Sequence, residues 1–383
     1  MNQITAIAAT IALALGSQFV TAGSITDTYT AGDTVSASTF ENIKTEVNDN
    51  DNRIDTNAGN IASLFGGDGS AGDLVISADA DWTATSPPNL FFNNVTIDAT
   101  TTLTVPSGTT IYCSGAFINN GLILVASNNN RTGQFNGRSN LRTTTPATVS
   151  LRLGSRNPDI GDAASSATNG SWSPNSGQSF SGGQGGSAMQ EAAIRSSIGR
   201  MYRGGGAGGG SDTQGTSGGG ALRVLCRGDI SNNGEIRANA NAAGSGGGGG
   251  GGGIIVLASP TSVQHLGTGT LSANGGNGGN VVVFGNLLRG AAGGGGGGIV
   301  ALIAPTLVNV GTISVDGGTG GTGGTNVLTN DSDRISGGGG GASGGNGGSG
   351  GFMNPGTNAT AFDGTDGSLG ITVLIAASPE ALF

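Results

Sequence analysis

Runs of almost pure glycine lie directly before short apolar segments, and this pairing limits what the chain can fold into. Eight consecutive glycines at 246–253 precede the apolar residues 254–258, and six at 293–298 precede 299–304. Fixing a glycine in one backbone conformation costs about 0.5–1 kcal/mol more than fixing an alanine. The 79 glycines of the chain therefore either stay disordered or allow backbones to pack closely.

The pairing recurs with a nearly constant spacing. Glycine runs begin near residues 204, 246, 293 and 337, which gives intervals of 42, 47 and 44 residues. The apolar segments 221–225 and 371–375 follow glycine-rich stretches, whereas 110–113 has no such run before it. A period of this size indicates stacked structural repeats.

A longer unit becomes visible when the apolar segments are aligned. Residues 113–123 match 226–236, with Cys113 opposite Cys226 and an Asn-Asn-Gly sequence in each copy. Shorter copies lie at 269–275 and 311–317. We interpret each copy as two short strands joined by a turn, the second of which ends at Asn or Asp before glycine.

These repeats predict a mainly β fold in which each apolar strand stacks on its counterpart in the next copy. Extended glycine can form a left-handed threefold helix whose backbone groups point sideways. Neighbouring runs then satisfy one another's N–H and C=O groups where no side chain holds them apart. The predicted fold is a glycine-rich β-solenoid with polyglycine II segments. The alternative is flexible linker, which has no need to keep register with the strands.

A helical stem is predicted in front of the repeats, at residues 38–66. Apolar residues and two asparagines alternate at spacings of three and four, as in a coiled coil. Ser38 with Glu41 makes a capping box, and glycines at 66–67 end the helix. A single amphipathic helix packed on its own domain is the alternative. The seam consists of Phe40, Ile43, Val47, Asn50, Ile54, Asn57, Ile61 and Leu64.

The repeated Val47-x-x-Asn50 and Ile54-x-x-Asn57 units resemble the seam of trimeric autotransporter adhesins and trimeric phage fibres. That resemblance implies a homotrimer in which Asn50 and Asn57 coordinate an anion on the threefold axis. Autotransporters of this kind end in a membrane β-barrel segment, for which the last residues, 371–383, are too short.

The glycine-rich pattern over residues 67–128 and 204–383 is similar to the distal adhesins of some phage tail fibres and to glycine-rich bacterial surface proteins. The opening segment 67–77 has the same character. The resemblance implies that loops between glycine strands contact a receptor. It implies no catalytic residue.

The N-terminus reads as a secretory signal at residues 1–22, followed by a linker at 23–37. Residues 4–15 are apolar and uncharged, and Val20-Thr21-Ala22 supplies small residues before a cleavage point. We expect a secreted protein, extracellular or at a cell surface, with no membrane span in the mature chain. In such a compartment Cys113 and Cys226 are a candidate disulfide, with stacked reduced cysteines as the alternative.

An arginine-rich insertion is predicted at residues 129–203, between a first β region at 67–128 and the glycine-rich repeats at 204–383. Arginine and aromatic side chains are typical of interfaces, so the insertion is a candidate site for a glycan or protein receptor, or for another subunit. A solvated loop region is the alternative. The candidate binding residues are Arg131, Arg138, Arg142, Arg152, Arg156, Trp172, Arg195, Arg200, Tyr202 and Arg203.

Several function classes fit the sequence poorly. A net charge of −9 disfavours nucleic acid as a partner, and no glycine run ends in the Gly-Lys-Ser/Thr of a phosphate-binding loop. The chain has one histidine and one lysine, and we expect no catalytic residue, cofactor or metal site. Asp-rich turns leave a β-helical polysaccharide-acting enzyme as an alternative, and Thr319, Thr322 and Thr325 leave ice binding. The sequence predicts an exported adhesive or structural fibre protein, a trimer, or else a subunit of a self-assembling filament.

Overall fold

The computed structural model describes residues 48, 65–127, 172–173, 182–201, 204–210, 215–284, 287–327, 333–354 and 358–382. The chain divides into two compact units, 1–61 and 62–383. The predicted signal segment, the linker and nearly all of the helical stem, including Asn50 and Asn57, lie outside the described residues. Apart from residue 48, every described residue belongs to the second unit.

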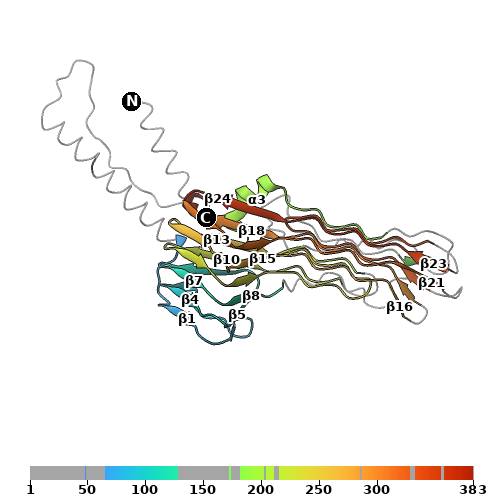
Figure 1. Cartoon of the computed structure of the whole chain (residues 1–383), viewed down its shortest axis with the longest axis horizontal. Coiled ribbons are helices and arrows are strands. Elements are labelled where there is room, and N and C mark those ends of the chain that lie inside the picture. Colours follow the sequence, from blue (N-terminus) through green and yellow to red (C-terminus); the bar gives the residue numbers. More distant parts are fainter. Residues whose placement is uncertain are drawn as a thin grey trace, which may run out of the picture. The chain divides into compact units, whose positions relative to one another are not determined.

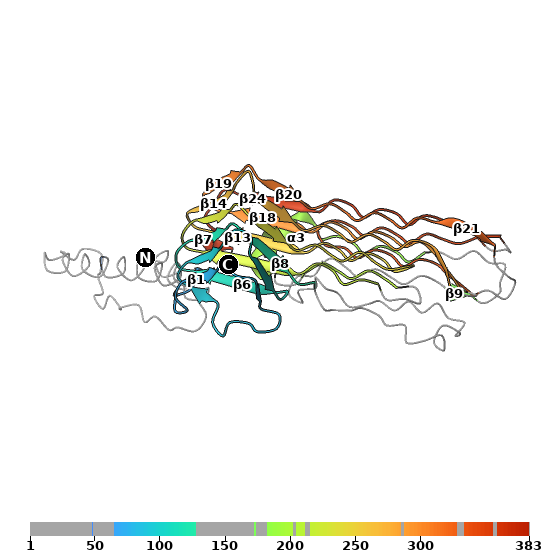
Figure 2. The same cartoon turned by 60° about the horizontal axis from the view of Figure 1, so that its bottom comes forward.

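The second unit is mainly β and is built around three parallel sheets of six strands each. Figures 1 and 2 show the three sheets gathered at one end of this unit. Sheet one contains β3 (Phe91–Phe92), β6 (Thr109–Cys113), β10 (Ala221–Cys226), β13 (Ile254–Ala258), β18 (Ile299–Ile303) and β24 (Ile371–Ile375). Sheet two contains β1 (Leu74–Ile76), β4 (Val95–Ile97), β7 (Phe117–Asn119), β11 (Ile230–Asn232), β14 (Ser262–His265) and β19 (Thr306–Asn309). Sheet three contains β2 (Ala80–Asp81), β5 (Thr102–Val105), β8 (Leu122–Val125), β12 (Glu235–Arg237), β15 (Thr270–Ser272) and β20 (Thr312–Ser314).

The chain passes through the three sheets in turn and then begins the next pass. Cys226 pairs with Cys113 in sheet one, and Asn232 pairs with Asn119 in sheet two. Ile236 pairs with Ile123 in the third. These are the residues matched in the sequence, so the predicted stacking of equivalent positions is confirmed.

The prediction of two strands per copy is wrong, because each complete pass makes three. The chain bends between the second and third strands at a glycine. A β carbon on Gly234 would lie 2.1 Å from the carbonyl oxygen of Gly121, its counterpart one pass earlier. Because glycine has no side chain, the bends of successive passes can lie in contact here. The chain can therefore turn into a third strand in each pass.

The inner strands β13 and β18 of sheet one are buried on both faces, which explains their unbroken apolar sequences. One face lies in the core enclosed by the three sheets, where Leu257 contacts the same cluster as Phe117. The other face packs beneath α3 (Glu191–Ser197) and η1 (Ile198–Arg200). A further 3-10 helix, η2 (Pro379–Ala381), lies near the end of the chain.

Residues 182–201, which the sequence placed with the insertion, belong to this body. Ile194 and Ile198 are buried against the outer face of sheet one, together with Met189 and Met201. The Gly-Gly-x spacing at 182–187 brings Gly183 and Gly186 into hydrogen bonds with Gly337 and Gly340. The C-terminal part of the predicted insertion therefore packs on sheet one.

Extended, glycine-rich rows run between passes and hydrogen-bond to one another; together we call them the glycine lattice. It comprises 182–189, 204–210, 215–220, 238–243, 246–253, 273–281, 290–298, 315–323, 336–343, 344–351 and 362–370. Figure 2 shows these rows leaving the three sheets side by side in one direction.

The row at 293–298 lies inside the lattice and bonds to rows on six sides. Its bonds recur every third residue, so that Gly293 and Gly296 donate to Gly338 and Gly341, as expected for a threefold extended helix. One bond to each neighbouring row is as follows: Gly249 N to Gly293 O at 3.0 Å, Gly293 N to Gly338 O at 2.9 Å, Gly294 N to Thr365 O at 3.0 Å, Gly295 N to Gly276 O at 2.8 Å, Gly348 N to Gly294 O at 2.7 Å and Gly318 N to Gly295 O at 2.7 Å.

The spacing between rows leaves no room for a side chain. A β carbon on Gly295 would lie 1.9 Å from the carbonyl oxygen of Gly250, and one on Gly297 would lie 1.9 Å from that of Val315. The prediction that neighbouring glycine runs satisfy one another's backbone groups is confirmed for the described rows.

Candidate functional site

The far ends of the lattice rows carry short strands, which we call the tip. Figure 1 shows β16, β21 and β23 at the end of the rows opposite the three sheets. One tip sheet has the order β16-β17-β22-β9, and a second consists of β21 paired with β23. Their bounds are β9 (Trp172–Ser173), β16 (Val282–Phe284), β17 (Leu287–Arg289), β21 (Gly324–Val327), β22 (Asp333–Ile335) and β23 (Asn358–Ala361).

Two antiparallel segments at the tip, 352–354 and 360–362, present side chains alternately inward and outward. Met353 and Ala361 form an antiparallel bridge and are buried against Leu288. Since neighbouring residues of an extended segment point to opposite faces, Phe352 and Phe362 face outward.

Phe352 and Phe362 form an exposed aromatic stack. Their ring centroids are 3.9 Å apart, with 13° between the ring planes. Phe352 is 44% exposed and Phe362 is 38% exposed. The amide of Phe362 donates to the carbonyl of Phe352 at 3.0 Å, so the backbone fixes the spacing of the pair.

Exposed polar residues lie close to this stack in the sequence. Asp363 follows Phe362, is exposed, and accepts a hydrogen bond from the Gly323 amide at 2.6 Å. Asn354 is exposed, and its backbone N–H donates to the carbonyl of Thr360 at 3.0 Å. The tip thus combines apolar ring faces with a carboxylate and a side-chain amide on a backbone held by the lattice.

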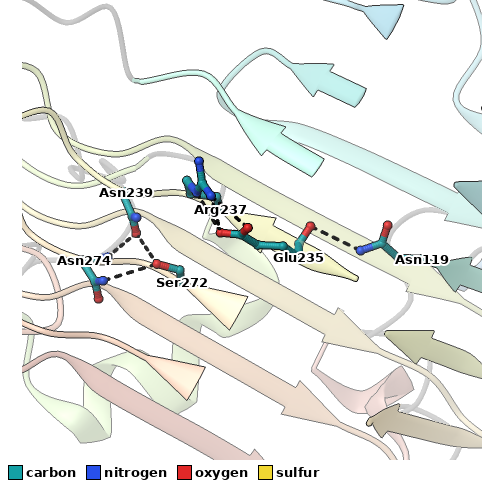
Figure 3. Close-up of polar contacts among 6 residues, drawn as sticks. All are labelled: Asn119, Glu235, Arg237, Asn239, Ser272 and Asn274. Atoms are coloured by element: carbon teal, nitrogen blue, oxygen red, sulfur yellow. Dashed lines mark hydrogen bonds and ion pairs between the residues drawn. The ribbon is translucent and has the colours of Figure 1, made fainter. Parts of the chain in front are cut away.

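Polar side chains also line the edge of the lattice, where they accept hydrogen bonds from backbone N–H groups. Figure 3 shows one such contact, in which Asn239 Oδ1 accepts from the Ser272 hydroxyl at 2.7 Å and from the backbone N–H of Asn274 at 2.7 Å. Along the next row, Asn277 and Asn280 accept from the amides of Thr319 and Thr322 at 2.9 and 2.8 Å. These asparagines satisfy N–H groups of the neighbouring row at the lattice edge. The threonine spacing that suggested ice binding is part of this arrangement.

A polar ladder lies inside the three-sheet core. Asn119 Nδ2 donates to Asn232 Oδ1 at 2.7 Å, and Asn232 Nδ2 lies 3.1 Å from His265 Nδ1. His265 Nε2 lies 3.0 Å from the Thr312 carbonyl oxygen, which can only accept. Nε2 therefore carries the proton and Nδ1 accepts from Asn232. All three side chains are fully buried, so the histidine has a structural place in the core.

Cys113 and Cys226, paired in register in β6 and β10, are joined by a disulfide. Both are fully buried within the core of the three sheets. The bond connects the passes on either side of the insertion, across a sequence separation of 113 residues.

Carboxylates in the first two passes are hydrogen-bond acceptors with lowered pKa values. The amides of Asn94 and Asn93 lower the pKa of Asp73 below its ordinary value of 3.8. The Ser70 hydroxyl and amide lower the pKa of Asp68, and Thr83 does the same for Asp81. These aspartates stay charged at neutral pH and fix loops.

The residues predicted to bind a partner are not brought together in the described part of the chain. Trp172 lies in β9 of the tip sheet, opposite Ile335. Arg195 lies on α3 and pairs with Glu191 at 2.8 Å, and Arg200 ends η1. Arg131, Arg138, Arg142, Arg152, Arg156, Tyr202 and Arg203 lie outside the described residues.

The aromatic stack at the tip was missed by sequence reasoning, although the sequence holds a signal for it. Between residues 204 and 382 the aromatic residues are Phe284, Phe352 and Phe362. Phe284 lies in β16, so all three lie at the tip. Scarcity of aromatic residues elsewhere in this half marks the place where they gather.

Among the described residues there is no group of three or more His, Cys, Asp or Glu side chains able to hold a metal ion. No helix in the described part of the chain is long and apolar enough to cross a membrane. Comparison of the chain with protein-family models, with curated proteins and with solved structures gives no match in any of the three.

Proposed function

We propose that this chain is an exported adhesive fibre protein that binds a partner through the tip of its glycine lattice, without catalysis. The observation that carries the proposal is the six-sided hydrogen bonding of the row at 293–298. A lattice held on every side by backbone bonds is a stiff support, and rigid supports position binding loops well. Apart from β9, the strands of the tip directly precede or follow the glycine rows in the chain.

The architecture behind this proposal is a glycine-rich β-solenoid with polyglycine II rows. The three parallel sheets, paired in register, support the β-solenoid. The hydrogen bonds at every third residue support the polyglycine II rows. The proposal keeps the prediction that residues 38–66, which lie almost entirely outside the described residues, form a coiled coil with Asn50 and Asn57 in a trimeric seam. The disulfide fits export, because such bonds persist in oxidising compartments.

The first test is binding of fluorescent full-length protein to a panel of bacterial and eukaryotic cells. Fab fragments raised against segment 352–362 should block retention, whereas Fab fragments raised against segment 371–382 of the body should leave it unchanged. No retention by any cell, or equal block by both Fab fragments, would contradict the proposal.

A second candidate function, a subunit of a self-assembling filament, is favoured by the last strands of the sheets. β19, β20 and β24 end their sheets, and Val308, Val310 and Leu374 are 36%, 66% and 45% exposed. Unpaired strand edges are templates for pairing with another chain. Electron microscopy of the purified protein separates the two: discrete trimers with a stalk support the adhesin, and long fibres with an axial repeat support the filament.

A further inference from the structure

We propose that the Phe352–Phe362 stack binds an uncharged hexopyranose unit of a surface glycan. The inference rests on the proposed function and names the partner of the same tip. Three features of the tip support it: the exposure of the rings, their fixed geometry and the polar groups beside them.

Exposure comes first. Large apolar side chains left in water usually mark an interaction site when they gather, and the exposed Phe352 and Phe362 lie together at the tip. Phe352 and Phe362 shield one face of each other, since they stack at 3.9 Å. The two outer ring faces are the parts of the stack that a ligand can cover.

The extent of the patch selects a small ligand. A phenylalanine side chain has roughly 150–250 Å² to bury, so exposures of 44% and 38% leave roughly 120–200 Å² for contact. A stable protein–protein interface buries about 800 Å² on each partner. The stack is therefore too small for a second copy of the chain, and its size suits one or two sugar rings.

The geometry is fixed in advance. Gly351 donates to the Ala291 carbonyl at 2.9 Å next to Phe352, and Gly364 donates to the Gly321 carbonyl at 2.9 Å next to Asp363. Both segments are thus tied to lattice rows at the point where they present the rings. A ring pair that is ordered before binding loses little entropy when a ligand covers it.

The polar neighbours select the chemistry. A pyranose ring presents an apolar C–H face and a rim of hydroxyl groups, which suits an exposed ring pair on segments that also expose Asp363 and Asn354. A carboxylate accepts up to about four hydrogen bonds, so Asp363 can accept from sugar hydroxyls while it holds the Gly323 amide. The same negative charge disfavours sulfated, phosphorylated or sialylated sugars.

The experiment is isothermal titration of the full-length, oxidised protein with soluble hexasaccharides. The probes are β-1,4-linked hexamers of glucose, N-acetylglucosamine, mannose and galactose, with heparin and polysialic acid as anionic glycans. We expect at least one uncharged hexamer to bind and both anionic glycans to fail.

The variants Phe352→Leu and Phe362→Leu keep an apolar side chain but remove the ring face, and each should weaken binding about tenfold or more. Phe352→Tyr should retain affinity. The matched control is Phe91→Leu, because Phe91 is another exposed ring, 41% exposed and stacked on Tyr112 at 4.8 Å, but it lies in the body. It should bind as the wild type does.

Three outcomes overturn the inference: no uncharged hexamer binds, an anionic glycan binds instead, or the leucine variants bind with unchanged affinity. If cells still retain the protein, the tip Fab still blocks, and neither hexasaccharides nor leucine variants have an effect, this inference is wrong and the proposed adhesive function stands. If cells do not retain the protein but the hexamer titration succeeds, the proposed adhesive function fails by itself.

Discussion

In the three-sheet body the strands enclose side chains, whereas in the glycine lattice the rows touch backbone to backbone. Phe117 and Leu257 fill the space between the sheets and are fully buried, so the body is stabilised mainly by removal of apolar surface from water. The row at 293–298 has no side chains, and its neighbours meet it on six sides through N–H and C=O groups.

The two regions therefore have opposite sensitivities. In the body, removal of atoms leaves a cavity and destabilises the fold. In the lattice, addition of a single carbon atom forces neighbouring rows apart, because the nearest backbone oxygens lie about 2 Å from the place it would take. The glycine runs look tolerant of substitution in the sequence, but in the structure they tolerate an added side-chain atom least.

The largest effect is expected from Gly295→Ala, whose β carbon would lie 1.9 Å from the Gly250 carbonyl oxygen. We expect a loss of more than about 4 kcal/mol in the free energy of unfolding, measured by denaturant titration. The matched control is Gly244→Ala, because an added β carbon there meets nothing within 4 Å. Equal stability of the two variants would remove the distinction between body and lattice.

Phe117→Ala tests the body by the opposite change. Phe117 is fully buried in the three-sheet core, and its truncation should cost about 3–5 kcal/mol. Hydrogen exchange should rise first in peptides of β4, β7 and β11, which neighbour it in sheet two. If peptides from the glycine rows lost protection before these strands, the two regions would not be stabilised separately.

Asn232→Ala removes the middle rung of the buried ladder. It leaves His265 Nδ1 without its donor inside the core and Asn119 Nδ2 with the Glu235 carbonyl alone, and an unsatisfied buried polar group costs about 1–3 kcal/mol. Urea unfolding of the variant measures the loss. As a control, Asn233→Ala changes an exposed amide that bonds to Asn120 and should be close to neutral.

The smallest effect is a pH dependence confined to the first passes. Hydrogen bonds lower the pKa of Asp73 in the folded state, so its contribution is present above the unfolded value and is lost as the pH falls through the folded value. Below about pH 4 the loops around β1 and β4 should loosen, as measured by amide resonances of residues 74–76 and 95–97.

The variant Asp73→Asn serves as the control for the pH effect, because it should remove the pH dependence of these resonances. A transition that persists unchanged in that variant would assign the effect to other groups.

Much of the body could be predicted from the sequence, because its repeats place equivalent residues in register. Alignment of the repeats matches Cys113 with Cys226 and Asn119 with Asn232, and these pairs lie opposite each other in the sheets. The backbone bonding between glycine runs was predicted for a related reason, since only glycine permits such close rows.

Other features depend on contacts that the repeat does not encode. The third strand of each pass arises at corners such as Gly234, where the close approach to Gly121 becomes visible only in three dimensions. The inclusion of residues 182–201 in the body depends on Ile194 and Ile198 reaching sheet one. The aromatic stack joins Phe352 and Phe362, which occupy no position of the aligned repeat.

The most direct test of the account is hydrogen–deuterium exchange of the glycine rows in the intact protein. Because each amide of the row at 293–298 donates to another backbone carbonyl, we predict that peptides covering 246–253 and 293–298 exchange as slowly as those covering β13 and β18. Complete exchange of the glycine peptides within seconds, while the strands remain protected, would show that these segments are linkers and would contradict the lattice.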